Sequence, residues 1–134
     1  MQKYLRLLFF AFLFSIPAAS CSPQTGGLIC TISIESDEKA ILPPADVSFA
    51  DGNSVLDVLK SATRRNRIQM EFTGIGMAAY VRGIDNLYEF DKGPESGWIF
   101  YVNGSRAKEG CGTVKVGEGD EIKWVYVLEI PPME

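Results

Sequence analysis

Few residues in this chain could perform chemistry, because the sequence contains no histidine. Ser-His-Asp and Cys-His arrangements need an imidazole, so both are excluded. Three acidic residues, Asp85, Asp91 and Glu95, are of the right type for a general acid and base pair. Acidic residues in polar loops are more commonly solvated turn residues. We therefore expect no enzymatic activity, and we expect no metal site because the imidazole ligand is missing.

The other reactive side chains are three cysteines, Cys21, Cys30 and Cys111. Cys21 follows Ala18-Ala19-Ser20, and this segment resembles a bacterial lipobox, in which the cysteine receives a diacylglycerol before cleavage. The same bond also fits the small-residue preference of ordinary signal peptidase. With Cys21 lipidated, Cys30 and Cys111 remain as a pair that an oxidising compartment would join as a disulfide. The alternative is a free Cys21 in a soluble secreted protein.

The first 20 residues have the pattern of a secretory leader. Lys3 and Arg6 give a positive start, and the apolar run Leu7–Phe14 follows. This run is too short to cross a bilayer of about 30 Å, which needs roughly 20 residues. We expect residues 1–20 to be a signal peptide, 21–27 a lipid-attached tether and 28–134 the folded domain, on the outer face of the cell membrane. The alternative is a membrane anchor that stays uncleaved.

The body after the leader is acidic. Of the 13 basic residues, Lys3 and Arg6 precede Cys21, whereas all 17 acidic residues follow it, which leaves a net charge of −6. An acidic surface repels the phosphates of nucleic acids and anionic lipid headgroups. We therefore expect no nucleic-acid partner, and membrane attachment through the lipid alone.

The secondary structure that must position the candidate acidic residues and cysteines consists of one helix and several strands. Ser54 and Asp57 have capping-box spacing before a helical apolar pattern, which predicts a helix over 54–66. Pro43-Pro44 is expected to break the chain, and Asn103-Gly104 to form a tight turn. The pattern predicts an α+β fold with a single helix packed on a mixed sheet. Alternation of apolar residues predicts strands near 28–34, 68–72, 79–81, 98–102 and 122–128, with short ones near 47–49 and 114–116.

Aromatic side chains are the strongest candidates for a binding surface. Trp124 and Tyr126 fall on the core face of the last predicted strand. Trp98 suits a core position and a ligand platform equally well. Exposed clusters of aromatic residues usually indicate recognition. The aromatic residues on or beside the loop-rich segment 74–104, some of which must approach the surface, are Tyr80, Tyr88, Phe90, Trp98 and Tyr101.

Four segments, taken in order, resemble a known family. They are Ser54–Lys60, Asn86–Phe90, Gly97–Gly104 and Val116–Trp124. The chain is similar to bacterial cell-surface domains related to the C-terminal β-domain of transcobalamin and intrinsic factor. The resemblance covers residues 28 to 129, approximately, and implies a β-grasp fold. Bacterial members also carry cysteines at the positions of Cys30 and Cys111.

The resemblance also implies a ligand surface. In the animal carriers this domain forms half of a cobalamin cleft, through backbone groups and aromatic side chains. The matching positions lie around Trp98 and the strand that leads into Asn103. The sequence contains no counterpart of the α-helical half, and without histidine it offers no imidazole to cobalt. We therefore expect a face for a flat cobalamin-type ligand and no covalently bound cofactor; the candidate residues are Trp98, Tyr101, Asn103, Tyr88, Phe90 and Tyr80.

Two functions remain as hypotheses. The first is a binding module for a flat or amphipathic small molecule, such as a cobamide, that is delivered to a membrane transporter. The second is a cell-surface interaction domain that docks another protein by strand addition and has no small ligand. An exposed aromatic face favours the first, and an uncovered sheet edge favours the second.

Overall fold

The computed structural model describes residues 26–132, so the predicted leader and Cys21 lie outside the described residues. No helix within these residues is long and apolar enough to cross a bilayer. The chain runs through β1 (Leu28–Glu35), β2 (Ala40–Phe49), α1 (Val55–Asn66), β3 (Met70–Thr73), the 3-10 turn η1 (Gly76–Ala78), β4 (Tyr80–Ile84), β5 (Leu87–Tyr88), β6 (Gly97–Val102), β7 (Ser105–Arg106) and β8 (Glu121–Val127).

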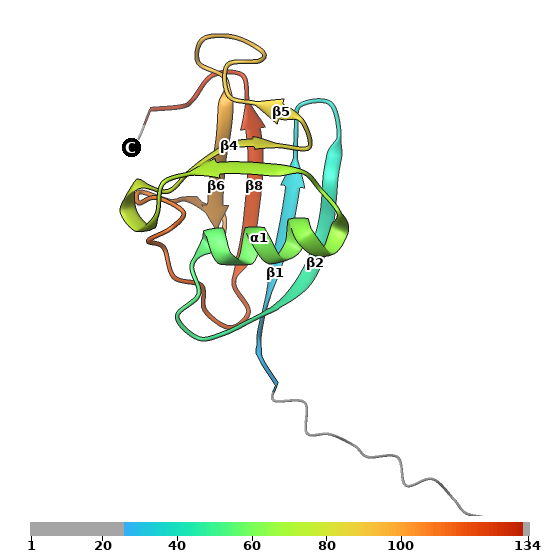
Figure 1. Ribbon diagram of the computed structural model, residues 1–134, viewed down its shortest axis with the longest axis vertical. Helices are drawn as coiled ribbons and strands as arrows, with labels where there is room; N and C mark the ends of the chain where they lie inside the picture. Colours follow the sequence, from blue (N-terminus) through green and yellow to red (C-terminus); the bar gives the residue numbers. More distant parts are fainter. Residues whose placement is uncertain (1–25, 133–134) are drawn as a thin grey trace, which may run out of the picture.

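The strands form two sheets. A five-stranded sheet has the order β2-β1-β8-β6-β7, and a three-stranded sheet has the order β3-β4-β5. The pair β1–β8 is parallel, whereas β1–β2, β6–β8 and β6–β7 are antiparallel. Figure 1 shows α1 and the smaller sheet crossing the same face of the larger sheet. The predicted α+β class, with one helix packed on a mixed sheet, is confirmed.

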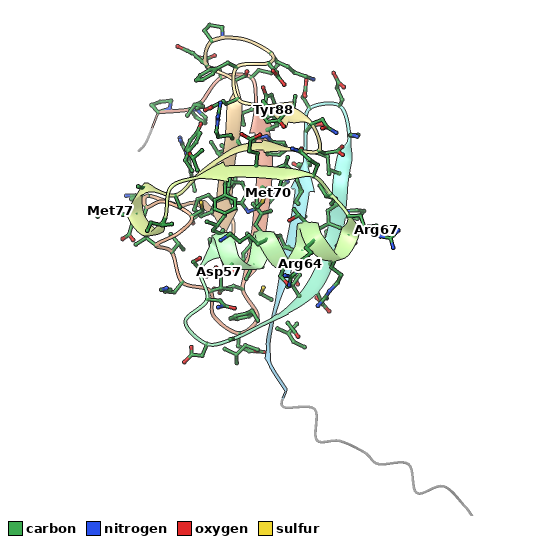
Figure 2. The ribbon with its side chains drawn as sticks, in the orientation of Figure 1. Asp57, Arg64, Arg67, Met70, Met77 and Tyr88 are labelled. Atoms are coloured by element: carbon green, nitrogen blue, oxygen red, sulfur yellow. The ribbon has the colours of Figure 1, made fainter. Side chains whose placement is uncertain are left out.

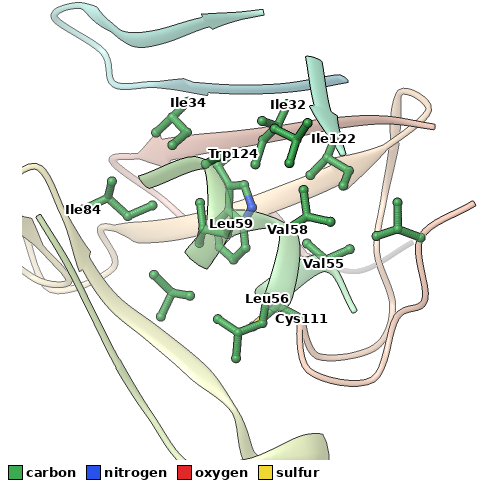
Figure 3. Close-up of a cluster of buried hydrophobic side chains, with 14 of the residues drawn as sticks. Ile32, Ile34, Val55, Leu56, Val58, Leu59, Ile84, Cys111, Ile122 and Trp124 are labelled. Carbon is green, nitrogen blue, oxygen red and sulfur yellow. The ribbon is translucent and has the colours of Figure 1, made fainter. Parts of the chain in front are cut away.

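The helix begins at the residue that its capping box predicts. Ser54 is the N-cap, its Oγ accepts from the Asp57 backbone N–H at 3.3 Å, and its own N–H donates to Asp57 Oδ2 at 2.9 Å. These two bonds satisfy amides that a helix start otherwise leaves unpaired. Arg67 ends the helix in the left-handed conformation, with φ 56°. The buried face of α1, which includes Val55, Val58 and Leu59, packs on the larger sheet (Figure 3).

The core lies between α1, the smaller sheet and the covered face of the larger sheet. Alternate residues of β1 and β8 point into it, so that Ile32 pairs with Ile122 and Ile34 with Trp124 across the central parallel pair. Trp124 lies at the centre of this cluster in Figure 3 and is fully enclosed. The prediction that Trp124 and Tyr126 are core residues is confirmed.

Two local predictions are wrong. Pro43-Pro44 does not break the chain, because β2 continues through both prolines from Ala40 to Phe49. β2 is an edge strand, where a residue without an N–H is tolerated, and the register with β1 shifts between Ile32 and Ile34. The predicted strand at 114–116 is only an isolated bridge between Lys115 and Ser54.

Candidate functional site

Trp98 on β6 is a core residue and not an exposed platform. Its side chain is only 5% exposed, and its indole Nε1 donates to the Leu87 backbone oxygen at 2.8 Å. The ring meets that of Tyr126 edge to face, with centroids 5.2 Å apart. A buried indole whose polar atom is already paired offers no free hydrogen-bond donor to a ligand. The structure therefore places Trp98 in the core.

Tyr126 ties the loop between β5 and β6 to the core. Its hydroxyl donates to the Tyr88 backbone oxygen at 2.8 Å and lies 2.9 Å from Ser96 Oγ. Ser96 is almost fully buried, and its hydroxyl donates to the Gly93 oxygen at 2.9 Å. Buried hydrogen bonds thus fix the base of the loop, and this fixed base positions the exposed residues of the loop.

A groove lies between β4, β6 and the segment 106–111. Its volume is about 150 Å³, and its lining is mainly apolar. Both tryptophans of the chain contribute to it, which places the groove directly on the core. Besides Trp98, the side chains and backbone that line the groove include those of Tyr80, Phe100, Arg106, Cys111 and Trp124.

Trp124 brings an unpaired polar atom to this region. The residue is 2% exposed and stacks on Phe100, with ring centroids 5.0 Å apart and planes inclined by 30°. Its Nε1 has no hydrogen-bond partner among the described residues. Figure 3 shows this nitrogen among aliphatic side chains. A buried N–H without a partner costs about 1–3 kcal/mol, which offsets part of the stability that burial of the indole ring contributes.

Exposed apolar side chains continue from the groove to the end of the larger sheet. Tyr80 borders the groove and is 42% exposed. Its hydroxyl and the Ile130 side chain both lie within 4.0 Å of the position that a Cβ on Gly97 would occupy. Phe90 and Ile130 are joined to the same end, because their backbone amides donate to Ser96 and Glu95. We call Tyr80, Phe90, Leu128 and Ile130, which are all exposed, the apolar rim.

The phenol of Tyr80 stays protonated over the physiological range. Burial of part of the ring, together with the neighbouring Glu89 carboxylate, raises the pKa of Tyr80 to about 12. A neutral hydroxyl is both a donor and an acceptor. The groove is therefore bordered by an aromatic ring with a neutral polar tip, a combination that suits an amphipathic ligand.

The remaining predicted ligand residues do not join the groove. Tyr88 packs its ring over Gly83, and its hydroxyl accepts from Gln69 Nε2 at 2.9 Å. Figure 2 shows Tyr88 at the end of the molecule that carries the loop after β5. Tyr101 points to the opposite face of the larger sheet, where it lines a shallow depression with Lys123.

Asn103 has a structural role in the turn between β6 and β7. Its Nδ2 donates to Asp120 Oδ1 and its Oδ1 accepts from the Glu121 N–H, both at 2.9 Å. Asn103 has φ 51° and Gly104 has φ 81°, which is the left-handed pair of a two-residue hairpin turn. The predicted tight turn is confirmed. Both ends of the Asn103 amide are thus engaged within the turn.

The predicted disulfide between Cys30 and Cys111 is not formed, and both residues are free thiols. Cys30 Sγ faces the Val47 oxygen on β2, whereas Cys111 Sγ faces the Ala79 oxygen beside the groove, each at 3.8 Å. The thiols thus point to different carbonyl groups in different parts of the core. Burial raises the pKa of Cys30 to about 11 and also raises the pKa of Cys111.

The acidic candidates do not form a catalytic pair. Asp85 forms an ion pair with Lys39 at 2.6 Å, and Asp91 accepts from the Tyr88 backbone N–H at 2.8 Å. Glu95 is exposed at the outer loop. Residues 26–132 contain no group of three or more cysteine, aspartate or glutamate side chains that could hold a metal ion.

Sequence reasoning missed several groove residues, among them Phe100, Arg106 and Cys111. Alternation does place Phe100 on the same face as Trp98, and this signal was available. The segment 107–111 gave no signal, because it has no regular structure and reaches the groove only through tertiary packing.

Comparison with known proteins identifies a family. A profile described as a domain of unknown function, DUF4430, matches residues 52–127, which is more than half of the chain. The chain belongs to the DUF4430 family. No curated protein matches this DUF4430 chain.

Solved structures with similar folds include two that differ in size. Haptocorrin in complex with Cbi has a TM-score of 0.64 and 17% identity; the match covers 77% of the DUF4430 chain and 25% of haptocorrin. A Ruminococcus gnavus ATCC 29149 protein, to which metal binding has been attributed, has a TM-score of 0.53 and 14% identity, with 75% and 96% of the two chains covered. The DUF4430 chain therefore spans about a quarter of haptocorrin, and the likeness is one of fold.

Proposed function

We propose that this protein is a non-enzymatic binding module for a flat, amphipathic small molecule of the cobamide type. The observation that carries the proposal is the continuity between the aromatic groove and the apolar rim. Tyr80 belongs to both, so a ligand that enters the groove also lies against exposed apolar side chains. Large exposed apolar patches commonly mark ligand or partner sites. The similarity in fold to haptocorrin, whose structure contains Cbi, supports this choice of ligand class.

The size of the groove limits how such a ligand binds. Its volume of about 150 Å³ is below the roughly 300–1,000 Å³ of sites that enclose a whole small molecule. Only an edge or a side group of a corrin would enter, and the rest would lie over the rim. Because much of the ligand stays uncovered, we expect weak binding to this domain alone and tighter binding when a partner covers the other side. Cobalt is not a binding partner of this chain in the proposal, because the chain has no histidine.

We further propose that the protein acts on the outer face of the cell membrane as a lipoprotein attached through Cys21, and hands its ligand to a membrane transporter. The support is the leader pattern and the small residues before Cys21. The tether of residues 21–27 reaches about 20 Å when fully extended, which keeps the domain close to the bilayer. Mass spectrometry of the mature N-terminus tests the anchor. An unmodified terminal cysteine would exclude it.

Titration with cobinamide and cobalamin tests the ligand. The only two tryptophans of the chain line the groove, so their fluorescence reports on its occupation. We expect saturable quenching, and Tyr80→Ala should weaken binding by about fivefold. The matched control is Tyr101→Ala, which removes the same side chain from the opposite face and should leave binding unchanged. Unaltered fluorescence and corrin spectra up to roughly 1 mM ligand would exclude this function for the domain.

A further inference from the structure

The basic side chains of the domain are divided between ion pairs and positions without one. Of the 13 basic residues, Lys3 and Arg6 precede Cys21 and 11 follow it. Four of these 11 form ion pairs with carboxylates, namely Lys39, Arg82, Lys92 and Lys123. The other seven form no ion pair within residues 26–132, and they come from only two segments, α1 with the residue that ends it and residues 106–115.

Six of these seven bases form a surface that we call the basic face. Arg106 is set aside, because its guanidinium donates to the Pro131 oxygen. The members of the basic face are exposed or partly exposed, and they are Lys60, Arg64, Arg65, Arg67, Lys108 and Lys115. Figure 2 shows Asp57, Arg64 and Arg67 in succession along α1, with Met77 beyond the N-terminal end of the helix.

The two segments of the basic face are joined by backbone hydrogen bonds. The Val55 N–H donates to the Val114 oxygen and the Leu56 N–H to the Cys111 oxygen, both at 2.9 Å. An isolated bridge also pairs Ser54 with the residue at position 115. The segment that carries two of the six bases thus lies against the first turn of the helix that carries the rest.

Few acidic side chains oppose these bases. The Asp57 carboxylate accepts from the N–H and the hydroxyl of Ser54 at 2.9 and 2.8 Å, so it belongs to the helix cap. Glu71 on the neighbouring strand β3 pairs with Arg82 at 3.6 Å. Glu109 is exposed and has no ion pair within the described part of the chain. Because six bases face three acids, this surface is positive although the body as a whole has a net charge of −6.

A turn beside the basic face carries two large apolar side chains into solvent. Ile75 is 86% exposed and Met77 is 87% exposed, which makes them the most exposed large apolar residues in the described part of the chain. Met77 lines the same hollow as Lys108 and Glu109, so the turn borders the basic face directly. We call Ile75 and Met77 the apolar tip.

The backbone of this turn is fixed by close packing. The N–H groups of Ala78 and Ala79 donate to the oxygens of Ile75 and Gly76, both at 3.1 Å. A Cβ on Gly112 would lie only 2.3 Å from the Gly76 oxygen, so a side chain at position 112 would displace the turn. The turn is therefore ordered through its backbone, whereas its two apolar side chains make little contact with the rest of the domain. Exposed apolar groups of this kind mark protein or membrane contacts.

We infer that the basic face and the apolar tip dock on an anionic lipid bilayer, with the bases against the headgroups and the tip at the boundary with the acyl chains. Basic side chains combined with exposed apolar ones are the pattern of interfacial membrane binding. A soluble polyanion would satisfy the bases but would leave the apolar tip uncovered. The acidic remainder of the body does not prevent docking, because charges more than about 8–10 Å away are screened at physiological salt. This inference goes beyond the proposed ligand function and does not depend on the groove.

Vesicle sedimentation tests the docking. The protein carries Cys21→Ser and is cut ahead of residue 21, so that neither the leader nor a lipid contributes. We expect it to bind vesicles of equal parts phosphatidylglycerol and phosphatidylcholine and not vesicles of phosphatidylcholine alone. Binding should fall as salt rises from roughly 50 mM to roughly 300 mM. Equal binding to both vesicles, or none to either at roughly 1 mM lipid, would overturn the inference.

Two charge variants separate the basic face from net charge. The first replaces three of its bases, Arg64→Gln, Arg65→Gln and Arg67→Gln. The matched control replaces three bases that lie in ion pairs elsewhere, Lys39→Gln, Lys92→Gln and Lys123→Gln. Both lower the net charge equally, yet only the first should weaken vesicle binding by more than about tenfold. Equal losses in the two variants would mean that the basic face has no specific role.

Substitution of the apolar tip distinguishes a bilayer from a soluble polyanion. Ile75→Ser combined with Met77→Ser should weaken vesicle binding by about tenfold and leave its salt dependence in place. Leu128→Ser, at a side chain that is 52% exposed, is the control and should change binding little. Unchanged vesicle binding in the tip variant, together with full competition by polyphosphate, would assign the face to a soluble polyanion and contradict docking. A failed cobinamide titration leaves all of these readouts unaffected.

Discussion

The indole of Trp98 on β6 lies edge-on to the phenol of Tyr126 on β8, with ring centroids 5.2 Å apart and planes at 72°. The two residues are directly opposite in the antiparallel register. Each then donates a hydrogen bond to a backbone oxygen of β5, Trp98 to Leu87 and Tyr126 to Tyr88. One cross-strand pair therefore joins the larger sheet to the segment that carries part of the apolar rim.

Trp98→Ala should destabilise the fold and not merely weaken binding. Removal of a buried indole costs about 3–5 kcal/mol, and the Leu87 oxygen loses its donor. Urea unfolding followed by circular dichroism measures the change. Phe90→Ala, at a side chain that is 61% exposed, is the control and should shift the unfolding free energy by less than about 0.5 kcal/mol. Near-normal stability of Trp98→Ala combined with lost ligand affinity would restore Trp98 as a platform.

The two buried thiols should be unreactive in the folded protein and reactive after unfolding. In a Cys21→Ser chain purified without reductant, Ellman's reagent at pH 8 should detect no thiol in the native state and two in urea, because burial keeps Cys30 and Cys111 protonated and inaccessible. The pKa of Cys30 rises from an ordinary value of 9.0 to about 11. Its contribution to stability is therefore complete below pH 9 and is lost as the pH rises toward 11. An absence of thiols in urea would mean that the exported protein forms the disulfide after all.

The helix cap should make stability depend on acid pH. The hydrogen bond from the Ser54 backbone N–H holds the pKa of Asp57 below its ordinary value of 3.8. A depressed carboxyl pKa adds stability that is present above the unfolded value and is lost as the pH falls through the folded value. Unfolding free energies measured from pH 6 to pH 2 should therefore converge for the natural chain and Asp57→Asn at the acid end. Ser54→Ala should cost about 1 kcal/mol at neutral pH, and parallel acid profiles for all three proteins would argue against the cap.

Substitution of Asn103 should reduce stability without an effect on ligand affinity. Alanine removes the bonds to Asp120 and Glu121 and is strained at φ 51°, which together cost about 1–3 kcal/mol. Asn103→Gly removes the same bonds but tolerates the backbone conformation, so its loss should be smaller. Thermal unfolding and cobinamide titration of both variants check the two statements. A large loss of affinity in the glycine variant, with stability retained, would return Asn103 to the ligand site.

The sequence alone predicts the elements whose determinants are local. The capping pair Ser54 and Asp57 and the turn Asn103-Gly104 form bonds within a few residues, so their patterns identify them correctly. The chain break predicted at Pro43-Pro44 is wrong, because a proline interrupts a central strand but is tolerated in an edge strand. The sequence does not show which strand lies at the edge of the sheet.

The candidate site is less predictable, for a physical reason. Of the six residues expected to bind ligand, Trp98 and Tyr80 reach the groove, Phe90 lies on the rim, and Tyr88, Tyr101 and Asn103 lie elsewhere. Alternation along β6 correctly predicts that Trp98 and Tyr101 lie on opposite faces of the sheet. It does not indicate which of the two faces the rest of the chain covers. The groove itself depends on the distance between β4 and β6, which belong to different sheets. The periodicity of apolar residues in the sequence gives no information about that distance.

The prolines of β2 have a consequence for how copies of the domain can associate. Growth of a fibre by edge-to-edge joining of sheets requires two edge strands on each molecule that can form backbone hydrogen bonds. The edge strand β2 contains two prolines, which donate none. Because β2 cannot supply an unbroken row of N–H groups, edge-to-edge contact through this strand does not propagate from one copy to the next.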